Sequence, residues 1–381
     1  MDALVCALPT NVLLVSGYWP VTGTSVAVIT RNGVVHLLAP DDEAELAHGS
    51  WADVVETLSF GSLDEIKTAV DVLRAPLTAV MRDFGHRDRI VVGCETGAIV
   101  EPASYVGMHL FGNAIYELLR EIVSPDAVTS ADDLLVQLRS VLTPSEQTWV
   151  RRACEIAGSA FLHRGESLRP TLKETDVATL FRASLVSHGG LEDDGGRAGG
   201  DVFCMSGPNS AAAYAAYQRS RSRELQCGDL VLVHCNSYLN GYWTDITRTF
   251  CLAPIDEQKQ RMYEAIFAAR DAALAAIHPG VRAADVDHAA RVVLTDHGFA
   301  KEFKHGLGHG VGFAAINHNA VPRLHPASDD LLEPGMIFNI EPAIYFEGFG
   351  GIRHCDVVLL TDHAPEVLTP FQSTIESLTI T

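Results

Sequence analysis

Hydrophobic residues in the N-terminal part of the chain recur at both strand and helix spacing, which predicts an α/β domain. Asn32-Gly33 separates two short apolar runs and is typical of a β-hairpin turn. Pro76 interrupts one of the helical patterns, because a proline inside a helix removes a backbone hydrogen bond. The predicted strands cover 25–30, 34–38 and 89–93, and the predicted helices cover 65–84 and 103–122.

A second domain is predicted to begin near Thr143. This threonine suits a helix cap, and the proline after it suits the first helical turn. We therefore place the boundary after Leu142, which gives domains at 1–142 and 143–381. Glycine and aspartate dominate 188–201, which we expect to be a loop. The predicted helices of this domain cover 145–161, 175–187, 257–277 and 283–297, and its strands cover 201–205, 230–238, 242–252, 336–340 and 352–360.

Two reactive side chains lie on the hairpin around Asn240-Gly241. This dipeptide favours a two-residue type I′ turn, because both of its residues tolerate a positive φ. With that turn His234 faces Thr247, and His234 and Asp245 become diagonal neighbours about 7–8 Å apart on one face of the sheet. Both can then reach one ion or one substrate atom. The structural alternative pairs Asp245 with Arg248 and makes His234 a hydrogen-bonded core residue.

Three further segments place polar residues among glycines or apolar residues. His305 and His309 lie among four glycines, which disfavour a helix and allow the backbone to approach a site closely. Glu341 interrupts an apolar strand, so it needs a cation or strong donors nearby. Strand alternation puts Arg353 and Cys355 on one face. The structural alternatives are a surface loop, a salt-bridged glutamate and an ordinary half-buried strand.

Composition narrows the class of protein. With 381 residues, of which 47% are hydrophobic, the chain is globular and long enough for two domains. The 48 acidic and 28 basic residues give a formal net charge of −20, which argues against nucleic acid or an anionic membrane surface as a partner. No apolar run reaches the ~18 residues of a membrane span, and the N-terminus lacks the basic region of a secretory signal. Eight cysteines without a CxxC pair are expected to be reduced thiols in the cytoplasm.

The polar segments of the second domain, taken in their order, resemble the pita-bread metallopeptidases, which include Xaa-Pro aminopeptidases, prolidases, methionine aminopeptidases and creatinase. The resemblance covers roughly residues 145–370. It implies an α+β fold with a C-terminal pita-bread domain, an N-terminal α/β accessory domain like that of creatinase and prolidase, and a homodimer. The matching stretches are SGPNSA (206–211), GDLVLV and NGYWTDITRTF within 228–250, HGLGHGVG (305–312), LEPGMIFNIEPAIY (332–345) and GGIRHCDVVLLT (350–361).

The resemblance implies a centre of two metal ions held by two aspartates, one histidine and two glutamates. This chain keeps the second aspartate, the histidine and the first glutamate as Asp245, His309 and Glu341. His234 stands at the position of the first aspartate, and Cys355 stands at that of the last glutamate. The family's metal-ligating positions are therefore changed at two places.

Positions on the substrate side also depart from the family. Asn236 replaces a small residue, and Tyr214 stands where a substrate-handling histidine is common. His318 is a candidate for the second substrate histidine. Three residues, Asn236, Arg353 and His305, are candidates for binding substrate. The guanidinium of an arginine can bind a substrate carboxylate through two parallel hydrogen bonds.

The two lost carboxylates change what the site can hold. Two divalent cations would leave an excess of positive charge at low dielectric. Histidine and cysteine donors favour Zn²⁺ or Fe²⁺ over Mn²⁺. We expect either one divalent ion (Zn, Fe or Mn) on Asp245, His309 and Glu341 with His234 or Cys355, or a metal-free site resembling that of creatinase. In the metal-free site, histidines transfer the protons.

The expected function is hydrolysis of a C–N bond in a small amino-acid derivative or dipeptide, with an Xaa-Pro dipeptide as one option. Two other classes stay open. A pita-bread domain that has lost ligands can be a non-catalytic binding module, although histidine, cysteine and tyrosine are reactive replacements. Two histidines with one carboxylate also resemble the facial site of mononuclear Fe(II) enzymes. The candidate catalytic residues are His309, Glu341, His318 and Tyr214.

Overall fold

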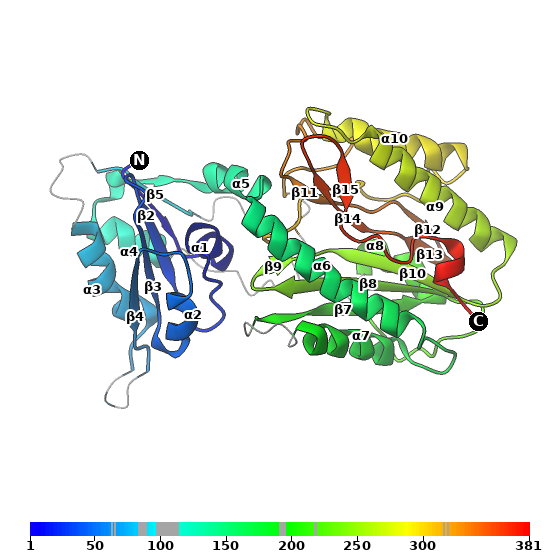
Figure 1. Cartoon of the computed structure of the whole chain (residues 1–381), viewed down its shortest axis with the longest axis horizontal. Helices are drawn as coiled ribbons and strands as arrows, with labels where there is room; N and C mark the ends of the chain where they lie inside the picture. The colour runs from blue at the N-terminus through cyan, green and yellow to red at the C-terminus, as the bar shows by residue number, and fades with distance from the viewer. Residues whose placement is uncertain are drawn as a thin grey trace. The chain divides into compact units, whose positions relative to one another are not determined.

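The chain folds into two compact units, Met1–Arg139 and Ser140–Thr381 (Figure 1). Leu142 and Thr143, between which the sequence places a boundary, are among the first residues of the second unit. None of the described helices has the length and apolar character needed to cross a membrane. The computed structural model describes residues 1–61, 64, 66–82, 90–96, 114–189, 196–216, 219–314, 317 and 320–381.

The first unit is built on a six-stranded sheet with the order β4-β3-β2-β1-β5-β6. Strands β1, β2 and β3 pair antiparallel, whereas β4, β5 and β6 join in parallel. The predicted hairpin of β2 and β3 is confirmed, and the N–H of Thr30 donates to the carbonyl of Val34. The strands are β1 (Ala3–Cys6), β2 (Val26–Thr30), β3 (Val35–Pro40), β4 (Val54–Leu58), β5 (Val92–Cys94) and β6 (Val128–Ser130).

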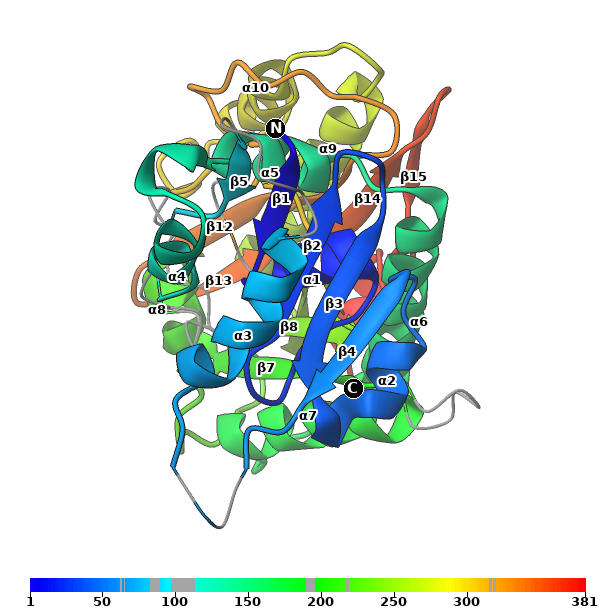
Figure 2. The same ribbon diagram turned by 90° about the vertical axis from the view of Figure 1, so that its left-hand side faces the viewer.

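Helices cover both faces of this sheet (Figure 2). On one face lie α3 (Ala69–Arg82) and α4 (Ala114–Ile122), and on the other lie α1 (Pro9–Ser16), α2 (Ala44–His48) and α5 (Asp132–Ser140). The predicted interruption at Pro76 is wrong, because α3 continues through it. The buried face of Leu73, Leu77 and Val80 outweighs one lost hydrogen bond. Of the predicted helix 103–122, residues 103–113 lie outside the described residues.

The described residues of the second unit form three sheets, and the polar residues of interest lie on their strands or in the segments beside them. The strands of the first, in the order β16-β10-β8-β7, are β16 (Thr379–Ile380), β10 (Ile246–Leu252), β8 (Leu230–Leu239) and β7 (Ala198–Ser206), and β9 (Tyr242–Trp243) also pairs with β8. The second joins β11 (Ile337–Ile340), β14 (Asp356–Leu360) and β15 (Pro365–Val367). The third is the pair β12 (Ala343–Phe346) and β13 (Gly350–Arg353).

The strands of this unit depart from prediction in three places. The predicted strand 242–252 breaks after Trp243, and the predicted strand 352–360 breaks after Arg353. Strand β7 begins at Ala198, inside the segment expected to be a loop, because its backbone pairs with β8 from its first residue. The middle of that segment, 190–195, lies outside the described residues.

Hydrogen bonds between side chains and backbone carbonyls join two of the helices to the first of these sheets. Thr143 caps α6 with a capping box, as the sequence predicts for this residue. Ser237 of β8 donates to the carbonyl of Ala153 in α6, and Tyr263 of α9 donates to that of Thr249 in β10. The longer helices are α6 (Pro144–Gly165), α7 (Glu174–Gly189), α9 (Glu257–Ala276) and α10 (Ala283–Asp296). The short helical elements are η1 (Asp41–Glu43), η3 (Pro125–Ala127), η4 (Gly207–Ala212), α8 (Ala213–Ala216) and α11 (Ile375–Leu378).

A fully buried arginine, Arg248 of β10, joins the first sheet to the second. Its guanidinium forms an ion pair with Asp356 at 2.7 Å, and Arg270 of α9 contacts the other oxygen of that carboxylate at 2.5 Å. Burial raises the pKa of Asp356, but Arg248, His354 and Arg270 together hold it well below its ordinary value. Arg248 also donates to the backbone carbonyls of Thr247, Cys355, Thr369 and Phe371.

We expect Arg248→Met to lower the free energy of unfolding by about 3 kcal/mol, because it removes one partner of a buried carboxylate and leaves buried carbonyls without their donor. Urea unfolding followed by circular dichroism measures the loss. The control Arg182→Met removes an exposed pair with Asp201 and should cost less than about 1 kcal/mol. Equal losses in the two variants would contradict a structural role for the buried pair.

Candidate active site

The hairpin of β8 with β9 and β10 presents His234 and Asp245 to the same place. Asn240 and Gly241 both have positive φ, 50° and 87°, so the type I′ turn is confirmed. His234 pairs with Thr247, which confirms the predicted register. Asp245 lies in the gap between β9 and β10, and its Oδ1 is 3.6 Å from Nδ1 of His234. The structural alternative for Asp245 is wrong, because Arg248 pairs with another carboxylate.

The glycine-rich segment brings His309 to the other oxygen of Asp245. His309 Nε2 lies 3.5 Å from Asp245 Oδ2, and its Nδ1 lies 3.0 Å from the carbonyl of Gly310. A Cβ atom at Gly308 would lie 2.0 Å from the carbonyl oxygen of Asn339. Only glycine permits this approach of two backbones, and it sets the position of the next residue, His309.

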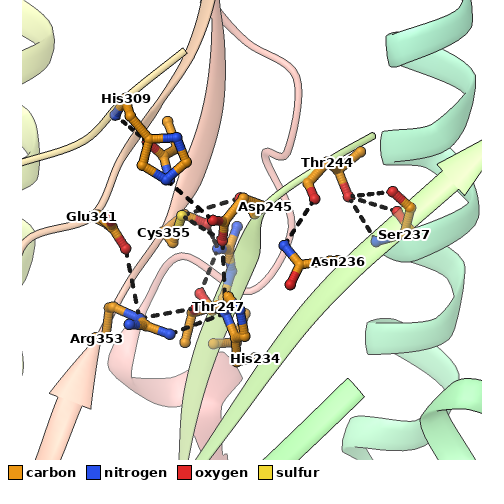
Figure 3. Close-up of polar contacts among 12 residues, drawn as sticks. His234, Asn236, Ser237, Thr244, Asp245, Thr247, His309, Glu341, Arg353 and Cys355 are labelled. Atoms are coloured by element: carbon orange, nitrogen blue, oxygen red, sulfur yellow. Dashed lines mark hydrogen bonds and ion pairs between the residues drawn. The ribbon is translucent and has the colours of Figure 1, made fainter. Parts of the chain in front are cut away.

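Glu341 and Arg353 approach from the other sheets (Figure 3). Glu341 follows β11 and Arg353 ends β13, and each side chain is buried. Arg353 Nε lies 3.8 Å from Glu341 Oε2, so Arg353 is the cation that a buried glutamate requires. The same guanidinium contacts His234 Nδ1 at 3.0 Å and donates to Thr247 Oγ1 at 3.1 Å.

Cys355 faces the site, and its neighbour His354 faces away from it. The thiol of Cys355 donates to the carbonyl of Asp245 at 3.1 Å. His354 Nε2 lies 3.4 Å from Asp356. Burial raises the pKa of the Cys355 thiol well above its ordinary value. A nucleophilic cysteine needs a lowered pKa, so Cys355 is a neutral donor here.

Asn236 joins this group to the hairpin backbone, since its side-chain hydrogen bond to His234 favours the charged form of that imidazole. Asn236 donates to the carbonyl of Thr244 at 3.1 Å and so contacts the hairpin backbone (Figure 3). His318 lies outside the described residues.

A row of rings connects Arg353 to a more exposed part of the unit. The hydroxyl oxygen of Tyr345 lies 3.5 Å from Arg353 Nη1 and 3.0 Å from His305 Nε2. The rings of Tyr214 and Tyr345 are 5.5 Å apart, and Tyr214 is 43% exposed. Tyr345 and Thr247 contact this group although the sequence pattern did not indicate them as site residues. The pairing of Thr247 with His234 could have indicated the threonine, whereas Tyr345 carries no comparable signal.

The two carboxylates of the site differ in their affinity for a proton. Burial raises the pKa of Asp245, but His234, His309 and Arg353 outweigh burial and lower it to about 2. Burial raises the pKa of Glu341 to about 7, although Arg353 opposes this. Asp245 is therefore ionised at neutral pH, and Glu341 changes charge near it.

The two histidines differ in the same way. Burial lowers the pKa of His234 to about 3, with Arg353 adding to the effect, so His234 is neutral. Burial also disfavours the charged form of His309, but its hydrogen bond to Asp245 and the charges of Asp245 and Glu341 raise its pKa above the ordinary value. Of the two histidines, His309 therefore binds a proton more tightly.

These residues do not fit the two-metal centre that the resemblance implies. Among the described residues, no three His, Cys, Asp or Glu side chains form a group that could hold a metal ion. The His234 nitrogen that faces Asp245 is contacted by Arg353, whose charge repels a cation at that distance. Cys355 is a thiol and not a thiolate. The same contacts disfavour an Fe(II) site on two histidines and a carboxylate.

Residues 148–362 match metallopeptidase family M24. The chain belongs to this family. It is 27% identical to the Xaa-Pro dipeptidase of Pyrococcus furiosus over 97% of this chain and 93% of that protein. It is 36% identical to the probable dipeptidase PepE of Mycobacterium tuberculosis, over 61% of this chain and 59% of that protein.

Solved structures agree with this M24 assignment. The prolidase of Pyrococcus horikoshii OT3 aligns with a TM-score of 0.77 at 25% identity, over 97% of this chain and 94% of that one. The X-Pro aminopeptidase of Thermotoga maritima aligns with a TM-score of 0.79 at 21% identity, over 100% of this chain and 97% of that one, and shows the fold. The predicted α+β pita-bread fold is confirmed, and the chain is a peptidase-type hydrolase.

We expect Glu341→Gln to stabilise the protein at about pH 8 and to have little effect on stability near pH 4. An unfolded glutamate has a pKa of about 4.3. The folded state, with a pKa of about 7, binds more protons between these values, so its stability falls as pH rises through that range. Melting temperatures of wild type, Glu341→Gln and the exposed control Glu333→Gln, measured across pH, test this. A Glu341→Gln protein that melts below wild type at pH 8 would contradict it.

We expect Gly308→Ala to destabilise the protein by about 2 kcal/mol or more, because the new methyl group meets backbone and not a movable side chain. The control Gly61→Ala adds a methyl group where nothing lies within 4 Å. Urea unfolding compares the two variants. A Gly308→Ala protein as stable as the control would show that the close approach does not fix His309.

Proposed function

We propose that the chain hydrolyses the C–N bond of a small dipeptide or amino-acid amide, with Glu341 transferring the proton. The observation that carries this proposal is a buried group in which Asp245 lies 3.5 Å from His309 and Glu341 lies 3.8 Å from Arg353. In this group the neighbouring charges favour the ionised form of Asp245, whereas burial raises the pKa of Glu341 to about 7, and such divergent pairs mark acid–base assignments in enzymes. No step of the proposed reaction uses a metal ion.

Glu341 is the general base and then the general acid. Its carboxylate takes a proton from water while the water oxygen bonds to the carbonyl carbon, and the C=O electron pair moves to the oxygen. When the tetrahedral intermediate collapses, the C–N bond breaks and its electron pair stays on nitrogen. Glu341 then gives its proton to that nitrogen. A pKa near the working pH suits both transfers.

His309 and Asp245 form a charged pair beside Glu341. In the proposed reaction the protonated imidazole donates to the oxygen on which negative charge develops. Asp245 keeps that imidazole charged and holds its orientation through the contact at 3.5 Å. The donor is therefore in place before the charge forms.

Two facts support a small substrate. His234, Asp245, His309, Glu341 and Arg353 are each 5% exposed or less, so the reacting bond would be shielded from most of the water. Two relatives carry names of dipeptidases, and one of these is named for Xaa-Pro dipeptides. We therefore propose dipeptides, with Xaa-Pro among them, as the first substrates to try.

We expect Glu341→Gln to lower kcat by about 10²–10⁴-fold with little change in KM, because only the proton transfer is lost. In wild type, kcat/KM should rise with pH as Glu341 ionises, with an apparent pKa near 7, and should fall again when His309 loses its proton. Release of free amino acid from a panel of Xaa-Pro dipeptides, other dipeptides and amino-acid amides measures both.

The exposed control Glu333→Gln should keep the wild-type rate. A folded wild-type protein that binds panel members without turnover would instead support a binding module. Full activity in Glu341→Gln would exclude Glu341 as the proton carrier.

A further inference from the structure

We propose that the guanidinium of Arg353 is the resident cation of this site and that it keeps divalent metal ions out. This inference concerns binding and does not depend on the proposed reaction. In Figure 3 the guanidinium lies between Glu341 and His234, below Asp245.

Arg353 already uses a lone pair of His234. Arginine has donors and no acceptor, so His234 Nδ1 accepts from Arg353 Nη2 in their contact at 3.0 Å. The same nitrogen lies 3.0 Å from Thr247 Oγ1. A metal ion needs that lone pair, and it cannot coordinate this nitrogen while the guanidinium donates to it.

The charges of the group also disfavour a metal ion beside the guanidinium. Asp245 and Glu341 supply at most two negative charges, and the guanidinium, 3.8 Å from Glu341, already offsets one. A divalent ion added to this buried group would leave uncompensated positive charge, which is costly at low dielectric. One such ion in place of the guanidinium would balance the charges.

His234 and Cys355 do not supply the negative charge that an added ion would need. His234 is an imidazole acceptor, and Cys355 directs its thiol to the carbonyl of Asp245 at 3.1 Å. Both side chains therefore satisfy protein groups and not an ion. Arg353 itself is anchored by Thr247 and Tyr345. The guanidinium is thus a built part of the site.

Titration of ZnCl₂ and MnCl₂ into three purified proteins tests the inference. Each carries Cys227→Ser, which removes an exposed thiol that could bind zinc. They are this parent, Arg353→Met, and the control Arg323→Met, which removes an exposed guanidinium paired with Asp330. Calorimetry measures the affinity and stoichiometry of metal binding. Mass spectrometry measures the metal content after dialysis, and melting curves show the effect of the metal on stability.

The parent and Arg323→Met should show no saturable site, and EDTA or either metal should leave their melting temperatures unchanged. Arg353→Met should bind one equivalent of Zn²⁺ at least ~10-fold more tightly than the parent, since a unit charge at hydrogen-bond distance is removed. Its melting temperature should rise with Zn²⁺ concentration.

Two results would overturn the inference. One is stoichiometric binding of Zn²⁺ or Mn²⁺ by the parent protein that is lost in Asp245→Asn. This measurement does not require that an Arg353 variant folds. The other is a folded Arg353→Met protein whose affinity for both ions equals that of the parent. Activity enters neither readout, so the proposed reaction and this inference can fail separately.

Discussion

The buried ion pair of Arg248 and Asp356 is the interaction on which the second unit depends. A buried charge is costly unless it has partners of suitable geometry. Here Asp356 forms ion pairs with Arg248 and Arg270, and Arg248 also donates to several backbone carbonyls. Because Arg248 also donates to the carbonyl of Cys355, it attaches β10 to the residue between β13 and β14. That attachment places Asp245, in the gap between β9 and β10, in the same group as Arg353 at the end of β13.

Charge balance then decides the chemistry of the group. Asp245 is kept ionised by neighbouring cations, whereas Glu341 holds its proton more tightly because burial outweighs the attraction of Arg353. A site that satisfies its own charges has less need of an added ion. His234 and Cys355 add no charge to this group at neutral pH, because burial favours the neutral form of each.

Much of the fold was visible in the sequence because local rules determined it. Asn240-Gly241 set both the turn and the register that brings His234 opposite Thr247. The strand breaks at Asp245 and Cys355 were not visible, because there the backbone leaves the ladder to direct polar groups inward. The alternation of faces at Cys355 was still predicted correctly.

The contacts of Arg353 could not be predicted from the sequence. As an arginine it suggested a binding group for a substrate carboxylate, but in the structure it contacts residues distant in the sequence, among them His234 and Tyr345. Pattern alone does not say which of several buried charges will pair, since that depends on three-dimensional packing. His318 keeps its role as a prediction, because it lies outside the described residues.

The hydrogen bonds of Arg248 also bear on the rate of folding. Its acceptors at Cys355, Thr369 and Phe371 lie 107, 121 and 123 residues further along the chain. Contacts of such long range require the closure of large loops, and chains rich in them fold slowly. The hairpin can form early, but its arginine stays hydrated until the distant carbonyls arrive. Assembly of the buried group therefore requires segments more than 100 residues apart in the sequence to meet.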